Sequence, residues 1–224
     1  MKLAEKYVFN SSTVANIDRD AINHNEPGYG FLLMQKAARY SFQILENENP
    51  QSITVFCGTG NNAGDGYLLA KYATEHGLNT RVISIESKEK LKGDAKRAMD
   101  EFEQTGGEVE RWSSEIELNS DWVVDAIFGI GLNRKLGALH EDVIHAINQS
   151  KSKVLSIDIP SGLCGDTGKI FGNAVSANLT TTYVGKKSGL YLYSGPDHVG
   201  KIFFSDLDID ESFYSKSAPV IKIV

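Results

Sequence analysis

Residues 53–66 constrain the fold of this chain more than any other stretch. The run from Ile53 to Cys57 is apolar, β-branched and closed by Gly58, which is typical of a buried strand. Four glycines then fall within nine positions, so the backbone can turn tightly and approach a ligand without an intervening Cβ. A helical pattern follows and stops at Gly77. Because a helix start presents free N–H groups, this strand, loop and helix predict a nucleotide-type binding corner.

Three polar side chains favour that interpretation over a glycine turn without a ligand. Asn61, Asn62 and Asp65 all lie inside the predicted loop. We expect the N-terminus of the following helix to lower the pKa of the Asp65 carboxyl and keep it ionised. The corner is therefore a candidate site.

Composition indicates one soluble domain spanning residues 1–224. Its formal charge is −6, from 23 basic and 29 acidic residues, which does not favour a surface that coats nucleic acid. Cys57 and Cys164 show no disulfide or metal-ligand spacing, so a reducing compartment is the simplest setting. The chain shows no apolar signal core and no membrane-spanning run. We therefore expect a cytoplasmic protein that binds neither nucleic acid nor membrane.

Outside the corner, strand patterns alternate with helical patterns. This alternation predicts a three-layer α/β/α fold with a mostly parallel central sheet covered on both faces. The first two helices precede the first strand, and we expect them to cover a sheet edge or a partner subunit. The last residues, 218–224, fit either a closing strand or the entry to a further domain. The expected helices are 12–23, 31–45, 91–104 and 141–148, and the expected strands are 53–57, 80–85, 122–128, 154–157, 179–184 and 201–204.

Two of these strands end in an acid beside a turn. Asp125 precedes a glycine turn at Gly129, and Asp158 precedes the proline-fixed turn that contains Ser161. Each acid taken alone fits a cap on the following turn as well as it fits a site. Since ligands of parallel sheets sit beyond the carboxyl ends of the strands, these two acids and the glycine corner together predict a shared pocket.

The oxygen atoms in these loops indicate a hard cation. The Asn62 amide, the Asp125 carboxylate and the Ser161 hydroxyl are ligands that group-I and group-II cations prefer. No cysteine or histidine spacing indicates zinc. One carboxylate among neutral oxygens suits a singly charged ion such as potassium, although the sequence alone leaves the choice open.

Four motifs occur in the order that one known family shows. They are Gly58-Thr-Gly-Asn-Asn-Ala-Gly-Asp-Gly66, Asp125-Ala-Ile-Phe-Gly-Ile-Gly-Leu132, Asp158-Ile-Pro-Ser-Gly162 and Lys187-Ser-Gly-Leu190. With them, the chain resembles the NAD(P)H-hydrate epimerase family, the YjeF N-terminal domain, over nearly its whole length. The resemblance implies a Rossmann-like three-layer fold, a homodimer and an isomerase of nicotinamide nucleotide repair. Such an enzyme interconverts the R and S forms of hydrated NADH and NADPH, and its functional partner is an ADP- or ATP-dependent NAD(P)H-hydrate dehydratase, separate or fused.

The resemblance also implies roles for residues. It implies one potassium ion (K+) per subunit, held by Asn62, Asp125 and Ser161. Asp158 is the first candidate for the catalytic acid/base, and Asp65 is the second. Ala63 stands where the family usually has glycine, so a positive φ there would add strain. The residues implied to bind the hydrated dinucleotide are Asn61, Asn62, Ala63, Gly64, Asp65, Gly129, Ile130, Gly131, Leu132, Asn133, Arg134, Lys135 and Asp158.

The implied reaction explains why the site needs an acid. C6 of the hydrated nicotinamide carries a hydroxyl next to the ring nitrogen, so loss of that hydroxyl gives a nitrogen-stabilised cation. Protonating the leaving oxygen and returning water to the other face inverts the carbon. Both steps need a positioned acid/base in a pocket that keeps the ring bound.

Two other functions compete with this hypothesis. An NAD-linked Rossmann dehydrogenase would use the G-x-G-x-x-A pattern from Gly58 to Ala63, with Glu86 as the ribose-binding acid. Asp65 would then place a negative charge close to the pyrophosphate, and Asp125 and Asp158 would have no role. A non-catalytic, dimeric YjeF-type scaffold would keep the fold and show no turnover on hydrated NADH.

Overall fold

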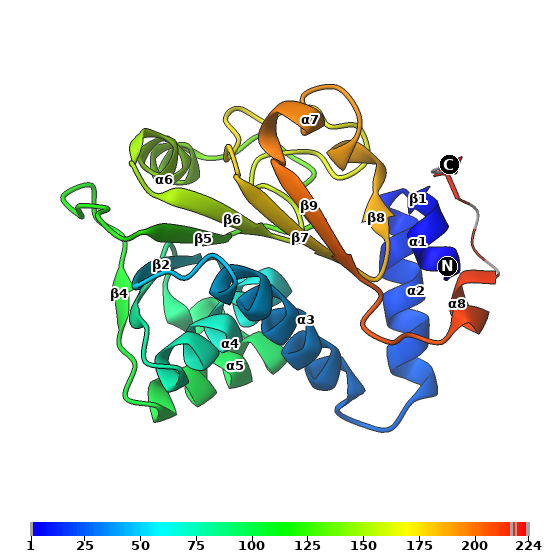
Figure 1. The fold of residues 1–224 in the computed structure, drawn as a ribbon, viewed down its shortest axis with the longest axis horizontal. Coiled ribbons are helices and arrows are strands. Elements are labelled where there is room, and N and C mark those ends of the chain that lie inside the picture. The colour runs from blue at the N-terminus through cyan, green and yellow to red at the C-terminus, as the bar shows by residue number, and fades with distance from the viewer. Residues whose placement is uncertain (1, 216, 218, 223–224) are drawn as a thin grey trace.

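Seven parallel strands form the central sheet of the computed structural model, which describes residues 2–215, 217 and 219–222 (Figure 1). Every neighbouring pair in this sheet is parallel. The predicted mostly parallel sheet is therefore confirmed. In spatial order the strands are β4 (Val109–Arg111), β3 (Asn79–Ser84), β2 (Ser52–Cys57), β5 (Trp122–Ala126), β6 (Lys153–Ile157), β7 (Leu179–Tyr183) and β9 (Lys201–Ser205).

Helices cover both faces of the sheet and complete the expected three layers (Figure 1). One face carries α3 (Tyr29–Glu46), α4 (Asn61–Glu75) and α5 (Gly93–Gln104), which share a large apolar core with the sheet. The other face carries α6 (Ala138–Gln149) over a second apolar cluster, with the short α7 (Gly195–His198) beside it. Among the described residues, no helix combines the length and the apolar character that crossing a bilayer requires.

A small second sheet joins segments from three distant parts of the chain. Its central strand β1 (Tyr7–Phe9) pairs in parallel with β8 (Lys186–Lys187) and antiparallel with β10 (Ile221–Lys222). The sequence did not predict β1 or β8, because strands of two or three residues carry no readable periodicity. The expected closing strand at 218–224 corresponds in part to β10, while Ala218, Ile223 and Val224 lie outside the described residues. The helices at this end are α1 (Leu3–Lys6), α2 (Ser11–His24) and α8 (Glu211–Ser215).

The two leading helices have different positions. The longer one, α3, packs on a face of the sheet against α4 and β7, so the expectation that it covers a sheet edge is wrong. The other, α2, packs against α8 at the end of the molecule where the small sheet lies (Figure 1). The apolar stripe of α3 is wide enough to be buried along its whole length, which explains its place on the face.

The glycine-rich corner is shorter than its sequence suggests. Helix α4 begins at Asn61, so the loop contains only residues 58–60. Glycine weakens a helix, but α4 is buried between the sheet, α3 and α5, and tertiary packing outweighs this propensity. A Cβ on Gly66 would lie 2.5 Å from the Cβ of Ala126, so this glycine permits close contact between α4 and the sheet. Ala63 is helical, and the strain expected from a positive φ at this position does not arise.

Candidate active site

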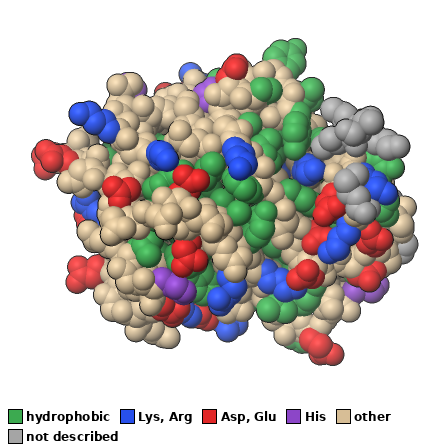
Figure 2. Space-filling view, viewed as in Figure 1, with side chains coloured by type: hydrophobic (Ala, Val, Ile, Leu, Met, Phe, Trp, Pro, Cys, Tyr) green, Lys and Arg blue, Asp and Glu red, His purple; other side chains and the backbone are tan. Residues whose placement is uncertain are grey.

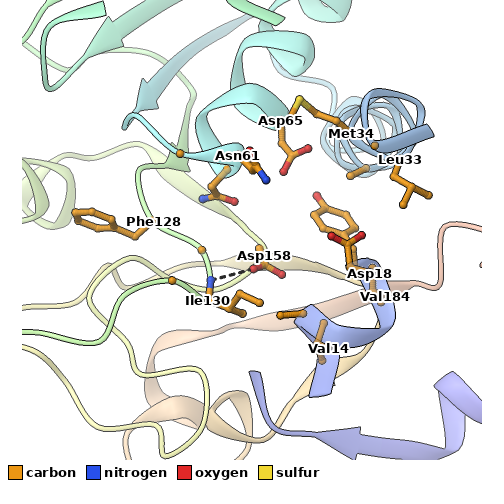
Figure 3. Close-up of a pocket in the computed structure, with 18 of the residues that line it drawn as sticks. Val14, Asp18, Leu33, Met34, Asn61, Asp65, Phe128, Ile130, Asp158 and Val184 are labelled. Carbon is orange, nitrogen blue, oxygen red and sulfur yellow. Dashed lines mark hydrogen bonds between the residues drawn. The ribbon is translucent and has the colours of Figure 1, made fainter. Parts of the chain in front are cut away.

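A cavity of about 580 Å³ lies beyond the carboxyl ends of β2, β5, β6 and β7. Its walls come from the start of α4, the loop after β5, and helices α2 and α3 (Figure 3). Its volume is in the range of small-molecule pockets, and its place is where open α/β sheets bind ligands. The candidate residues that line it are Asn61, Asn62, Asp65, Gly129, Ile130, Gly131, Leu132 and Asp158.

Five of the residues implied to bind the dinucleotide do not line this cavity. Ala63 and Gly64 are buried in the first turn of α4, behind the lining residues. A Cβ on Gly64 would lie 2.5 Å from the sulfur of Met34, so Gly64 lets α3 approach α4. The remaining three follow Leu132 along the loop and are exposed: Asn133, Arg134 and Lys135.

Asn62 places an unpaired amide at the wall of the cavity. The residue is buried, and neither its Oδ1 nor its Nδ2 has a hydrogen-bond partner among the residues that the structure describes. A buried polar group without a partner costs about 1–3 kcal/mol. Its oxygen faces the loop after β5, because a Cβ on Gly129 would lie 3.6 Å from Asn62 Oδ1 and 3.0 Å from Asp158 Oδ2. Asn62 is therefore poised for a ligand rather than for a protein partner.

Asp125 is fully buried and holds the loops after β5 and β6 together. Its Oδ1 accepts hydrogen bonds from the Ser161 hydroxyl (2.6 Å) and from the Ile127 N–H (3.3 Å). Its Oδ2 accepts from the Ser161 N–H and from the Ser156 hydroxyl, both at 2.8 Å. Burial raises the pKa of this carboxyl, while these hydrogen bonds oppose the shift. The expected strand 122–128 ends early, at Ala126, where the Ile127 N–H turns back to Asp125.

Asp158 occupies a strained turn at the end of β6. Its φ is 69°, and the N–H of Ile159 bonds the carbonyl of Ile157 across it (2.9 Å), which defines a γ-turn. Such a backbone costs about 1–3 kcal/mol and is found at functional sites. The carboxylate points into the cavity, where Oδ2 accepts from the Ile130 N–H at 3.3 Å (Figure 3).

Lys187 pairs with Asp158 from beneath the cavity wall. Its side chain is buried, and Nζ donates to Asp158 Oδ1, to Thr182 Oγ1 (3.0 Å) and to the Tyr183 carbonyl (2.9 Å). The sequence placed Lys187 in a motif but assigned it no role, because β8 is too short to show that this lysine is buried.

Asp65 differs most from the sequence-based expectation. Burial raises the pKa of its carboxyl well above the usual range, the charges of Asp158 and Asp18 raise it further, and Lys187 opposes the shift. The expected lowering by the helix N-terminus is wrong. Asp65 is the fifth residue of α4, and the effect of the helix end decays within the first turn. Its environment therefore favours the protonated acid.

A third acid, Asp18 of α2, faces the same cavity. Figure 3 shows Asp18, Asp65 and Asp158 directed at one space from three different elements. Burial raises the pKa of Asp18 as well. Nothing in the sequence pointed to this residue, because it lies on the polar side of an amphipathic helix far along the chain from the motifs. The cavity thus gathers three carboxyls, and burial raises the pKa of two of them.

Glu86 is not part of this site. It follows β3 and pairs with Lys90 and with His140 (3.5 Å). It does not line the cavity. The acid that a Rossmann dehydrogenase would use for ribose is therefore held by other side chains.

The raised pKa of Asp65 predicts how pH acts on stability. A carboxyl with a raised native pKa adds stability below its unfolded pKa and loses it as the pH rises through the native pKa. We expect Asp65→Asn to raise Tm at pH 8, by roughly 2–4 °C for each kcal/mol gained in the free energy of unfolding. The difference in Tm from the wild type should disappear towards pH 4. Differential scanning calorimetry from pH 4 to pH 9 measures it. Asp197→Asn is a control at an exposed carboxyl that makes no side-chain hydrogen bond within the described part of the chain, and a pH-independent Tm difference for Asp65→Asn would contradict the prediction.

Comparisons with known proteins agree with this geometry. Residues 31–189 match the family model described as the YjeF-related protein N-terminus. The chain is 33% identical over 207 residues to the NAD(P)H-hydrate epimerase of Levilactobacillus brevis, covering 88% of this chain and 93% of that protein. It is 34% identical over 209 residues to the bifunctional NAD(P)H-hydrate repair enzyme Nnr of Coxiella burnetii, covering 92% of this chain.

The relatives differ in length, and a solved structure shares the fold. This chain spans 42% of the Coxiella protein and 39% of the corresponding enzyme of Vibrio cholerae. The crystal structure of the yeast protein ynu0 superposes with a TM-score of 0.76 at 20% identity, covering 93% of this chain and 92% of that one. A family model that matches most of the chain, together with these relatives, shows that the chain belongs to the family of the YjeF-related protein N-terminus.

Proposed function

We propose that this chain is an NAD(P)H-hydrate epimerase, an isomerase that interconverts the R and S forms of hydrated NADH and NADPH. The observation that carries the proposal is a pair of acids in one cavity with different surroundings. Asp158 is ion-paired with Lys187, while burial favours the protonated form of Asp65. Acid and base roles follow from such contrasts of environment. The names of the relatives support the same activity.

The two acids can invert C6 without any change of oxidation state. The protonated Asp65 gives its proton to the C6 hydroxyl, the C–O bond breaks, and water leaves with the bonding electrons. The lone pair of N1 forms a double bond to C6, which gives a ring cation. Water then attacks the opposite face, its proton passes to the Asp158 carboxylate, and N1 regains its lone pair. A proton returned through solvent from Asp158 to Asp65 resets the site.

The cavity suits such an intermediate. It carries Asp18, Asp65, Asp94 and Asp158 against one lysine, and this negative balance stabilises a positive ring. The start of α4 presents N–H groups to the cavity, and no side chain caps them. These groups suit the phosphates of the dinucleotide.

A potassium ion is part of the proposal. Asn62, Asp125 and Ser161 would hold the ion, and their hard, mostly neutral oxygens suit a monovalent cation. The Asn62 oxygen is unpaired at the cavity wall. Asp125 and Ser161 do not line the cavity and hydrogen-bond each other at 2.6 Å, so the ion would share these oxygens with that bond. Within the described part of the chain, no cluster of three or more His, Cys, Asp or Glu side chains offers a rival metal site. A bound cation would supply fixed positive charge that orders the loops after β2, β5 and β6.

The proposal extends to the partner enzyme, the oligomeric state and the location of the protein. The chain acts with an ADP- or ATP-dependent dehydratase that removes water from one epimer, as a homodimer in the cytoplasm. On the face drawn in Figure 2, Lys and Arg side chains mix with Asp and Glu side chains and form no single basic patch of the kind that binds nucleic acid.

Sedimentation at assay concentration tests the dimer, and a monomer with full activity would contradict it.

The deciding experiment is a coupled assay. The pure R-form hydrate is mixed with an S-specific dehydratase, and recovery of NADH is followed by the absorbance of reduced nicotinamide in the presence and absence of this protein. We expect recovery only when both proteins are present. A scaffold would leave the R form unchanged, and a dehydrogenase would instead reduce NAD with a separate substrate.

Asp158→Asn tests the acid/base role in the same assay. Asparagine tolerates positive φ and can still accept from Lys187, so the fold should persist. We expect a loss of about 10²–10⁴-fold in kcat and a much smaller change in hydrate binding. Near-normal turnover would remove Asp158 from the mechanism and transfer its role to Asp65. A fall in Tm with turnover unchanged in the folded fraction would assign Asp158 a structural role only.

Thermal stability tests the cation. We expect KCl to raise Tm more than choline chloride does at equal ionic strength, because an ion that binds the native state alone stabilises it. Asn62→Ala should abolish this difference while leaving Tm in choline chloride unchanged or higher, since it removes an unpaired buried amide. Equal Tm values in both salts for the wild type would oppose a potassium site.

A further inference from the structure

We infer that Lys187 is a positioning residue that holds the Asp158 carboxylate in its reactive orientation and sets the balance of charge among the acids of the cavity. The inference rests on the proposed epimerase and adds a residue that it does not use. All three protons of the Lys187 ammonium group are taken up by acceptors of the protein, so it acts through Asp158.

Every proton of the Lys187 ammonium group has a defined acceptor. One acceptor is the Asp158 carboxylate, and the other two are the Thr182 hydroxyl and the Tyr183 carbonyl. Only 2% of the Lys187 side chain is exposed to solvent, against 14% for Asp158. A buried charge is tolerated only when it is paired and fully hydrogen-bonded, and removal of one partner leaves the other uncompensated. The ion pair is therefore fixed rather than fluctuating.

The pair also joins two strained turns. Asp158 follows β6 with φ 69°, and Val184 follows β7 with φ 63°. Each residue is the centre of a γ-turn, since Ile159 N–H bonds Ile157 O and Gly185 N–H bonds Tyr183 O. Positive φ at a β-branched valine is a true outlier. Lys187 contacts the Asp158 carboxylate in one turn and the carbonyl of Tyr183 in the other, so it ties both turns in place.

Lys187 is the one basic side chain lining the cavity within the described part of the chain. The titratable groups that line the cavity with it are Asp158 at the end of β6, Asp65 on α4, Asp94 on α5, Asp18 on α2 and Tyr183 on β7. Its charge opposes the rise in the pKa of Asp65 and of Asp18. A single cation among these four carboxyls contacts one of them, Asp158, and leaves the more distant acids to burial.

This arrangement serves an inversion that needs an acid and a base at once. Without Lys187, the Asp158 carboxylate would stand among other acids with no cationic partner. It would also lose the contact that aims it from a strained turn. Both effects reduce turnover while leaving the apolar and backbone contacts of the substrate in place.

The test compares Lys187→Met with Lys186→Met in the coupled assay. Lys186 is the adjacent, less buried lysine, whose Nζ donates to the Glu5 carbonyl away from the cavity. We expect Lys187→Met to lower kcat by about 10²-fold with little change in KM, the scale that misplacing a catalytic group produces. Lys186→Met should resemble the wild type in both constants. A kcat for Lys187→Met close to that of the wild type, or a loss that appears in KM alone, would overturn the inference.

A double variant separates positioning from a general loss of stability. If Lys187 acts through Asp158, Lys187→Met combined with Asp158→Asn should be no slower than Asp158→Asn alone. Additive losses would overturn the inference. Two variants guard against a failure of Lys187→Met to fold. The double variant leaves no buried carboxylate without its partner, and Lys187→Gln keeps a hydrogen-bond donor without the charge.

A carboxyl NMR signal keeps this test separate from the proposed activity. In ¹³C spectra recorded at one pH, the Asp158 carboxyl signal should move in Lys187→Met, which removes its ion-pair partner, and stay in place in Lys186→Met, whether or not the protein turns over the hydrate. Wild-type protein without epimerase activity would reject the proposed function alone. An Asp158 signal that is the same with and without Lys187 would reject the role of Lys187 alone.

Discussion

Close packing of α4 on the central sheet is the constraint on which the site depends. A Cβ at Gly66 would collide with Ala126, and a Cβ at Gly64 would collide with Met34 of α3. A Cβ at Gly58 would lie 2.2 Å from the carbonyl of Ile127. These glycines therefore let one helix contact the sheet, a neighbouring helix and the loop after β5 at once. The contact places Asn62 and Asp65 of α4 opposite the ends of β5 and β6.

Hydrogen bonding then fixes the loops that face α4. The buried Asp125 carboxylate accepts four hydrogen bonds, one from Ser156 within β6 and three from the segments after β5 and β6. Ser161 in turn accepts the Phe128 N–H at 2.9 Å. These bonds offset the cost of burying the carboxylate. They also make the glycine loop after β5 a rigid wall, from which the Ile130 N–H reaches Asp158.

Stability and function compete in this cavity. An unpaired amide, a carboxyl with a raised pKa and two backbone turns with positive φ each destabilise the native state. All four features lie around one space, and the large apolar cores on both faces of the sheet compensate for them. Backbone strain and acids with shifted pKa values, gathered in one place, are typical of a catalytic site with pre-organised groups.

The sequence by itself determined the layers of the fold and most of the motifs. Strand and helix periodicity was readable because each element buries one face, and glycines, acids and prolines marked the strand ends. It failed at β1, β4 and β8, since two or three residues carry no period. It placed Asn61–Gly66 in a loop, because the burial that keeps these six polar or small residues helical is a tertiary effect. Only the tertiary structure decided the charges. Asp18 lies far from the motifs in the chain, Lys187 belongs to a motif that does not reveal its burial, and burial together with neighbouring charges reversed the expected shift in the pKa of Asp65. A protonation state depends on desolvation and on neighbours in space, which the order of residues along the chain does not specify.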